Sequence, residues 1–373
     1  MNKFHATSFG RPRIKVLVVD DSAFMRKAIR QILESDPRIE VIGTARNGED
    51  ALEKLQELAP DVVTLDVNMP HMDGLTCLRH IMSTHPLPVV MISSLTQEGA
   101  KETFEALDLG AVDFIPKLSG TISLDIDRQK KEIIAKVKAA AFAKIERKKP
   151  SVRPALKRAR ISLKKQGEKA LVSQKAVAIG VSTGGPQTLM RIIPYLPANL
   201  PASLLIVQHM PPNFTRAFAE RLNSASALEV KEAEAGDVVE DGKAYLAPGD
   251  YHMTVVKRTL GEGAIIRLSK EPSNVLHRPS VDVMMSSVAK VYGKNAVGVI
   301  LTGMGRDGAE AMVEIKRNGG KTIAQDEASS IIFGMPKAAI EMGCVDKVVS
   351  TEEMAQAIVR AVRGEGWRVK SKE

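Results

Sequence analysis

Short apolar runs alternate with amphipathic stretches twice along this chain, on either side of one strongly basic segment. This alternation is typical of a mostly parallel sheet, because each crossover between parallel strands needs a connecting helix. The pattern therefore predicts two α/β domains, which is also the natural division of 373 residues. We place the domains at residues 13–127 and 176–365, and a basic linker at residues 128–175.

The first domain is predicted to be a small doubly wound sheet of the flavodoxin-like (βα)5 kind. Met25, Ile29 and Leu33 recur at helical spacing after the first apolar run. The five strand candidates are residues 14–19, 39–44, 62–65, 89–93 and 112–115.

The second domain is predicted to be doubly wound and mostly parallel, with an antiparallel addition around residues 244–268. Its strand candidates are residues 176–181, 204–208, 244–247, 253–256, 264–268, 297–302, 322–324 and 346–349. Helical patterns fall at residues 187–193, 214–222, 280–291, 308–317 and 351–362.

The formal net charge of +9 belongs to one segment of the chain. Residues 128–175 hold seventeen Lys or Arg against three Glu, a net +14, so the remainder carries about −5. A domain that reads nucleic acid carries its positive charge on a folded face. Residues 132–144 could extend a last helix, but residues 147–174 hold too few apolar residues to fold alone, which predicts a mobile linker. We therefore expect no specific nucleic-acid partner.

The chain is expected to be cytoplasmic. Its first fifteen residues are polar, with no apolar core of a signal peptide, and no apolar run approaches the roughly 18 residues of a membrane span. We therefore expect no membrane insertion. Cys77 and Cys344 are far apart and fit no metal-ligand spacing, so both are predicted to be reduced thiols.

Polar side chains stand at the predicted strand ends of the first domain. Asp20 and Asp21 end the first strand, Asp66 ends the third, Ser93 ends the fourth, and Lys117 follows the fifth. Because the carboxyl ends of parallel strands meet at one edge, these side chains should converge. Three close carboxylates need a hard cation, and Mg²⁺ prefers oxygen ligands. Taken singly, each residue would be a solvated turn residue; together they predict a site where Asp66 accepts a phosphoryl group.

These motifs resemble the response-regulator receiver domain over residues 13–125. The matching segments are Val-Val-Asp20-Asp21-Ser, Leu-Asp66-Val-Asn68-Met-Pro-His-Met-Asp-Gly, Met-Ile-Ser93-Ser and Phe114-Ile-Pro-Lys117. The resemblance implies that Asp66 is phosphorylated and that Asp20, Asp21 and Asp66 hold Mg²⁺ with the backbone carbonyl of Asn68. It also implies that Ser93, Phe114 and Lys117 respond to phosphorylation.

A glycine-rich turn follows the first strand of the second domain. Gly180, Ser182 and Gly184 satisfy G-x-S-x-G, the pattern of a turn that projects a serine oxygen above a sheet. A similar turn can instead bind a phosphate at a helix N-terminus. From this loop alone the two interpretations are about equally supported.

Possible partners of Ser182 favour the nucleophile. A serine needs a base, usually histidine, that is oriented by a third group. His209 directly follows one core strand, and Asp307 lies in a glycine-rich loop after another. His252 and His277 compete with His209 as the base, but neither directly follows a core strand. A zinc site built from the three histidines is a weaker alternative, because no two have helical ligand spacing.

The loops of the second domain resemble those of the chemotaxis protein-glutamate methylesterases. The matching segments are Ile-Gly-Val-Ser182-Thr-Gly-Gly-Pro, Val-Gln-His209-Met-Pro-Pro, Leu-Ala-Pro248-Gly-Asp-Tyr-His252-Met, His277-Arg-Pro-Ser-Val-Asp282 and Leu-Thr-Gly-Met304-Gly-Arg-Asp307-Gly-Ala. The order Ser, His, Asp differs from the Ser, Asp, His order of ordinary α/β hydrolases.

The resemblance implies an esterase that needs no cofactor in its catalytic domain. Its substrates would be glutamyl methyl esters, and certain glutamines, on the cytoplasmic helices of chemoreceptors, and its phosphodonor a histidine kinase. Ser182, His209 and Asp307 would form the triad. Backbone amides near Ser182 and Met304 would hold the oxyanion, with support from Thr183. The alternatives are a response regulator that binds a phosphorylated ligand at residues 180–186, and a DNA-binding output that only the basic linker favours.

Overall fold

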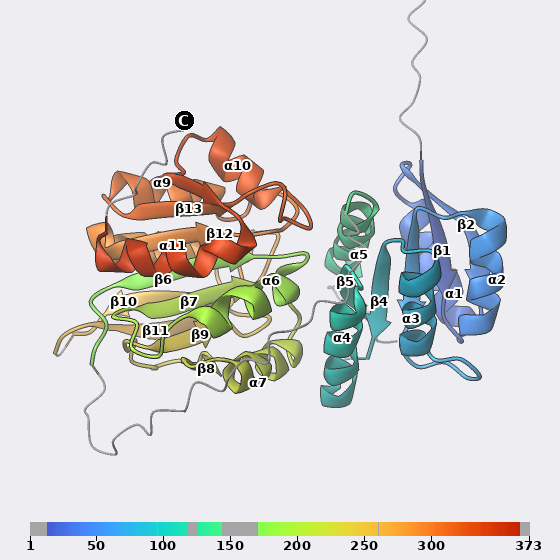
Figure 1. Ribbon diagram of the computed structural model, residues 1–373, viewed down its shortest axis with the longest axis horizontal. Coiled ribbons are helices and arrows are strands. Elements are labelled where there is room, and N and C mark those ends of the chain that lie inside the picture. Colours follow the sequence, from blue (N-terminus) through green and yellow to red (C-terminus); the bar gives the residue numbers. More distant parts are fainter. Residues whose placement is uncertain (1–12, 95, 118–125, 144–170, 260, 366–373) are drawn as a thin grey trace, which may run out of the picture. The chain divides into compact units, whose positions relative to one another are not determined.

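The computed structural model describes residues 13–94, 96–117, 126–143, 171–259 and 261–365, which divide into two compact units (Figure 1). Each unit has its own parallel sheet and its own core. The units are described separately below.

The first unit holds a five-stranded parallel sheet in the order β2-β1-β3-β4-β5 (Figure 1). Its strands are β1 (Ile14–Val19), β2 (Ile39–Ala45), β3 (Val62–Asp66), β4 (Val89–Ser93) and β5 (Asp113–Pro116). The connecting helices are α1 (Ala23–Glu34), α2 (Gly48–Leu58), α3 (Gly74–Thr84), α4 (Gln97–Leu109) and α5 (Ile126–Ala141). The order reverses direction beside β1, so the (βα)5 prediction is confirmed.

Local chemistry explains where three of these helices begin. Ser22, Asn47 and Asp73 each accept a hydrogen bond from a backbone amide three residues later, at the starts of α1, α2 and α3. Such N-caps satisfy amides that have no partner inside the helix. Each cap therefore fixes where the loop after the preceding strand ends and the helix begins.

Helix α5 occupies the first part of the segment predicted to be a linker from residue 128. Ile133 and Val137 are buried on one face of the helix, which accounts for its docking. Lys136 is also buried; its Nζ donates to Phe114 O (2.7 Å) and lies 3.2 Å from Asp113 Oδ1. Residues 144–170, which hold most of the predicted linker, lie outside the described residues.

The second unit holds a seven-stranded sheet in the order β14-β13-β12-β6-β7-β9-β8, all parallel (Figure 1). Its strands are β6 (Ala176–Val181), β7 (Ser203–Gln208), β8 (Glu229–Glu232), β9 (Lys243–Leu246), β12 (Ala296–Ile300), β13 (Lys321–Gln325) and β14 (Lys347–Val349). The helices are α6 (Gly185–Ile192), α7 (Phe214–Ala225), α8 (Val281–Tyr292), α9 (Ala309–Arg317), α10 (Met335–Glu341) and α11 (Thr351–Arg363), with short 3₁₀ turns at Ile193–Tyr195 and Gly293–Asn295.

The predicted antiparallel addition is only partly correct. Strands β10 (His252–Lys257) and β11 (Ala264–Ser269) do pair antiparallel, but they form a separate two-stranded sheet. Strand β9 runs parallel to β7 and belongs to the main sheet. Beside it, β8 has the sequence Glu-Val-Lys-Glu, a charged edge strand that hydrophobic patterning does not reveal.

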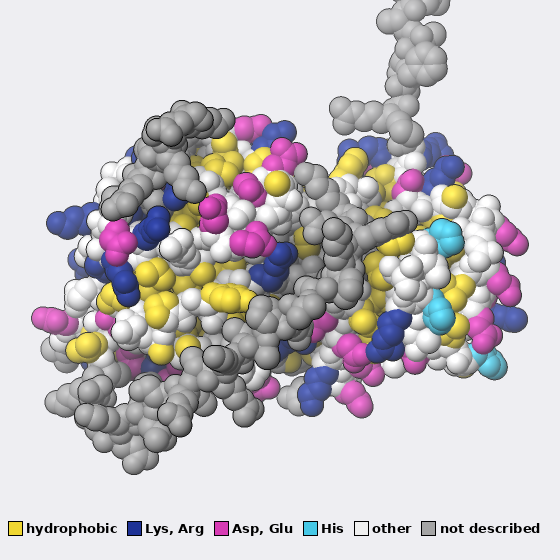
Figure 2. All heavy atoms as spheres, in the orientation of Figure 1, with side chains coloured by type: hydrophobic (Ala, Val, Ile, Leu, Met, Phe, Trp, Pro, Cys, Tyr) yellow, Lys and Arg dark blue, Asp and Glu magenta, His cyan; other side chains and the backbone are white. Residues whose placement is uncertain are grey.

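On the face shown in Figure 2, acidic and basic side chains of the described residues are interspersed, with no continuous basic patch.

None of the helices in the described part of the chain combines the length and apolar character of a membrane crossing.

Lys136 gives a test of the first unit. In Lys136→Met the stem remains, but Asp113 and the carbonyl of Phe114 lose a buried charged donor, so the free energy of unfolding should fall by about 3 kcal/mol. Hydrogen exchange of the β4 and β5 amides measures the change. Lys131→Met, at an exposed position of α5, should change it by less than about 0.5 kcal/mol; equal effects of the two variants would contradict the assignment.

Candidate functional sites

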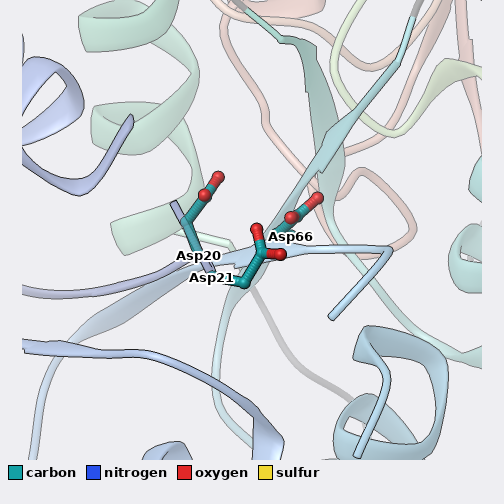
Figure 3. A group of neighbouring side chains, drawn as sticks. All are labelled: Asp20, Asp21 and Asp66. Atoms are coloured by element: carbon teal, nitrogen blue, oxygen red, sulfur yellow. The ribbon is translucent and has the colours of Figure 1, made fainter. Parts of the chain in front are cut away.

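Three carboxylates gather at the carboxyl edge of the first sheet. Asp20 and Asp21 follow β1 and Asp66 ends β3, and one oxygen of each lies within 4.8 Å of the others. Figure 3 shows the three side chains grouped where these strands end. Lys117, after β5, donates its Nζ to Asp66 Oδ2 at 2.8 Å. The structure thus brings together four of the residues that the sequence placed in this site.

The carboxylates lack enough donors to balance their charge. Burial raises the pKa of Asp66 to about 6, although the hydrogen bond from Lys117 opposes the rise. Burial likewise raises the pKa of Asp20, whose Oδ2 is buried without a hydrogen-bond partner. A buried carboxylate oxygen that has no donor beside two other carboxylates suits a hard divalent cation. The residues present therefore fit Mg²⁺.

The other predicted residues of this site lie on the loop after β3 and on strands β4 and β5. The amide of Asn68 donates to Asp66 Oδ1 (3.4 Å). Ser93 ends β4, the neighbour of β3 in the sheet, and its carbonyl accepts from the amide of Lys117 (2.7 Å). Phe114 is buried, with Lys136 Nζ lying 4.8 Å from its ring centroid. Its ring thus contacts α5, a contact that sequence analysis did not anticipate.

Three neighbouring strands of the second sheet end at one site. Strand β6 leads to Ser182, β7 leads to His209, and β12 precedes the loop that carries Asp307. In the sheet, β6 lies between β12 and β7, so the chain order reverses beside β6. This is the topological switch point at which doubly wound sheets bind their ligands.

Close backbone packing holds the loop of Ser182. The Ser182 amide donates to Thr302 O (3.0 Å), and Gln208 Nε2 donates to Ser182 O (3.0 Å). Gly184 has a φ of 76°, a conformation that side chains disfavour. A Cβ on Gly303 would lie 2.8 Å from Ser182 Cβ and 2.3 Å from Met335 Sδ. Two glycines therefore allow the serine turn to form against the β12 loop.

His209 and Asp307 form a direct hydrogen bond. His209 Nε2 lies 2.7 Å from Asp307 Oδ2, and both side chains are largely buried. The other ring nitrogen, Nδ1, is buried without a hydrogen-bond partner, so the Ser182 hydroxyl is not bonded to it. The structure forms the His–Asp half of the predicted triad and leaves Nδ1 as the nitrogen that can take a proton.

The first turn of α8 stabilises the charge of Asp307. Ser280 Oγ (2.9 Å) and the Asp282 amide (3.0 Å) donate to Oδ1, and the Val281 amide (2.7 Å) donates to Oδ2. Burial would raise the pKa of Asp307, but the hydrogen bonds and the neighbouring His209 hold it well below its usual range. Burial and the charge of Asp307 raise the pKa of Asp282 to about 6.

Two backbone amides at this edge have no acceptor among the described residues. Within the described part of the chain, the amides of Thr183 and Met304 donate no hydrogen bond to another residue. Both flank the site, one directly after Ser182 and the other on the β12 loop. The Thr183 carbonyl is held by the hydroxyl of Thr302 (3.0 Å).

The two competing histidines occupy different surroundings. His252 is fully buried; its Nδ1 accepts from the Ser280 amide and its Nε2 donates to Pro272 O, each at 3.2 Å. With both nitrogens engaged, it offers no lone pair to zinc. His277 stacks on His209, with ring centroids 4.0 Å apart and an angle of 18° between the planes.

Sequence reasoning missed several residues that support the site. Thr302, Gln208, Ser280 and Gly303 bind or closely contact the predicted residues. Ser280 could have been identified from the sequence, since it stands at the N-cap position of the helical pattern 280–291. The others hold backbone groups, which no local pattern identifies.

Comparison with known proteins agrees with this division of the chain. Residues 177–358 match the CheB methylesterase family, and residues 16–125 match the response regulator receiver domain. A protein-glutamate methylesterase/protein-glutamine glutaminase of Pyrococcus abyssi is 56% identical over 94% of both chains. One from Caldanaerobacter subterraneus is 48% identical over 94% of this chain and 97% of its own. The crystal structure of the Thermotoga maritima CheB methylesterase catalytic domain is 43% identical, covers 51% of this chain and 99% of its own, and has a TM-score of 0.49.

These identities extend over both units and over nearly the whole length of the relatives. The chain therefore belongs to the protein-glutamate methylesterase/protein-glutamine glutaminase family, in which a receiver domain precedes a CheB methylesterase domain.

Proposed function

We propose that this chain is a phosphorylation-activated serine hydrolase that removes methyl groups from glutamyl methyl esters on chemoreceptors. It would also deamidate certain receptor glutamines, in keeping with the second half of its relatives' name, protein-glutamine glutaminase. The observation that carries the proposal is the 2.7 Å bond between His209 and Asp307. These residues lie after the two strands that flank β6, and Ser182 directly follows β6. Adaptation of a chemotaxis response is the resulting role.

The chemistry follows from these contacts. Ser182 Oγ attacks the ester carbonyl while His209 takes its proton at Nδ1, because Nε2 is engaged with Asp307. Asp307, kept ionised by the α8 amides, stabilises the imidazolium. The amides of Thr183 and Met304 hold the oxyanion, which typically lowers the barrier by about 2.7–4 kcal/mol per donor.

The remaining steps return the enzyme to its starting state. The imidazolium gives its proton to the departing methoxy oxygen, which releases methanol and leaves an acyl-Ser182. Water then attacks this ester with His209 again as base, and the products are glutamate and free Ser182. Deamidation follows the same path with ammonia as the leaving group.

Phosphorylation of Asp66 regulates this reaction. We assign Asp20, Asp21, Asp66 and the carbonyl of Asn68 as ligands of Mg²⁺, on the basis of the acidic cluster. Bound Mg²⁺ would offset the charge of the incoming phosphoryl oxygens. Lys117 adds a second positive charge at Asp66, and Ser93 and Phe114 pass the change in Asp66 to the rest of the domain.

The partners follow from this assignment. The substrate lies on the methylated cytoplasmic helices of a chemoreceptor, the phosphodonor is a chemotaxis histidine kinase, and the protein works in the cytoplasm. The acidic cluster and the His–Asp site support these roles, since one accepts phosphate and the other hydrolyses an ester.

Replacing Ser182 by Ala tests the nucleophile. Methanol release from methylated chemoreceptor should fall at least ~10³-fold, because the attacking oxygen is lost while the fold remains. Gas chromatography measures the methanol, and circular dichroism checks the fold. Undiminished release from folded Ser182→Ala would refute the esterase mechanism.

Replacing Asp66 by Ala tests the switch. A small phosphodonor with Mg²⁺ should stimulate wild-type methanol release but not release by Asp66→Ala, whose basal rate should stay near that of the wild type. The physical reason is that the phosphoacceptor is lost, whereas Ser182, His209 and Asp307 are unchanged. Equal stimulation of both proteins would contradict regulation through Asp66.

The pH dependence of Mg²⁺ binding tests the acidic cluster. Because the pKa of Asp66 is raised to about 6, its carboxylate is ionised above that pH and takes up a proton below it. Mg²⁺ affinity, measured by calorimetry, should therefore be constant above about pH 7 and weaken as the pH falls to 5. Asp66→Asn should bind more weakly, with a smaller dependence on pH; an affinity that does not change in the wild type would exclude Asp66 as a ligand.

A further inference from the structure

We propose that His277 is a positioning residue for the esterase reaction, acting through the ring stacked on His209. It holds the His209 imidazole with Nε2 on Asp307 and Nδ1 free, and it stabilises the imidazolium that forms when Ser182 loses its proton. This inference rests on the proposed function, because it assigns a role in that reaction.

The need for a second restraint on His209 follows from its hydrogen bonding. A single bond from Nε2 to Asp307 fixes one atom of the ring, but rotation of the ring about its terminal torsion is broadly allowed. Nδ1 makes no hydrogen bond that would fix the plane. The parallel ring of His277, with its centroid 4.0 Å away, covers one face and restricts this rotation.

His277 is itself held in place by its neighbours. Next to it, Arg278 donates from Nε (2.9 Å) and Nη2 (2.7 Å) to Asp250 Oδ1. His252 binds the same segment at two points, Pro272 O and the Ser280 amide. The ring of His277 is therefore presented by an anchored segment, which makes it a support for His209.

The segment that carries His277 also contacts Asp307, the hydrogen-bond partner of His209. Ser280, three residues after His277, donates its hydroxyl to Asp307 Oδ1 (2.9 Å). Residues 277–280 thus contact His209 on its ring face and Asp307 on its carboxylate. A segment that contacts both partners can fix the distance between them, which is the requirement for a pre-organised base.

The stack also has an electrostatic effect on the reaction. His209 becomes a cation during attack by Ser182, and a cation near the face of an aromatic ring is stabilised when it lies within roughly 6 Å of the ring centroid. The His209 side chain is only 7% exposed, so solvent screens this interaction weakly. The ring face therefore favours the charged state of the base over its neutral state.

Three variants test the proposal. His277→Leu removes the flat ring, His277→Phe keeps a ring without nitrogens, and Asn274→Ala changes an exposed side chain of the same segment. Two rates are measured on the full chain: labelling of Ser182 by a fluorophosphonate, and methanol release from methylated receptor as separate kcat and KM. Labelling depends on the activated serine and requires no receptor binding.

The expected result is a loss of about 3- to 30-fold in labelling rate and kcat for His277→Leu, with KM unchanged. His277→Phe should stay within about twofold of the wild type, and Asn274→Ala should match it. Rescue by the ring alone, and an effect on kcat alone, are not expected from a residue that only stabilises the fold.

Two outcomes would overturn the proposal. Folded His277→Leu that labels at the wild-type rate would show that the stack is not needed, and His277→Phe as slow as His277→Leu would show that the ring face is not what matters. Should His277→Leu fail to fold, His277→Gln provides the same comparison with a planar group that has no aromatic ring. Wild-type protein that neither labels nor releases methanol would instead refute the proposed function itself.

Discussion

The candidate site of the second unit depends on one buried hydrogen bond, the bond between His209 and Asp307. A carboxylate in the interior is costly unless its oxygens are hydrogen-bonded. Asp307 meets that condition with the imidazole and three donors from the start of α8. The position of α8, its N-cap Ser280 and the strand that carries His209 are thereby linked, and displacing any of them would leave the charge short of donors.

In each unit the candidate site lies at the carboxyl edge of its own sheet, but the carboxylates of the two sites have opposite pKa shifts. In the first, carboxylates gather with too few donors, and burial raises the pKa of Asp66 to about 6. In the second, Asp307 has a full set of donors and a pKa below its usual range. The first arrangement suits a divalent cation, because it has uncompensated negative charge. The second suits an imidazolium, because its carboxylate stays ionised throughout the reaction.

Glycines at the second site show how backbone packing serves chemistry. Gly303 lets the β12 loop approach Ser182, and Gly184 adopts the left-handed conformation that starts α6. Within the described residues, the amides of Thr183 and Met304 on these two loops donate no hydrogen bond. The position of the Ser182 side chain and the positions of the two amides therefore depend on the same two loops, which follow β6 and β12.

The alternation of apolar runs and helices predicted two α/β folds from the sequence alone, and the polar residues at strand ends predicted which side chains lie close together at each sheet edge. Local patterns are sufficient for these predictions, because strand ends and helix caps depend on residues that are neighbours in the sequence. The order of strands in a sheet is a long-range property, so only the tertiary structure decided that β9 is parallel, that β8 exists as a charged edge, and that β6 lies between β7 and β12. Long-range packing likewise decided that Nε2 of His209 faces Asp307, that His277 stacks on it, and that Lys136 contacts Phe114. These contacts join residues far apart in the chain, and their geometry depends on how whole elements dock rather than on any local pattern.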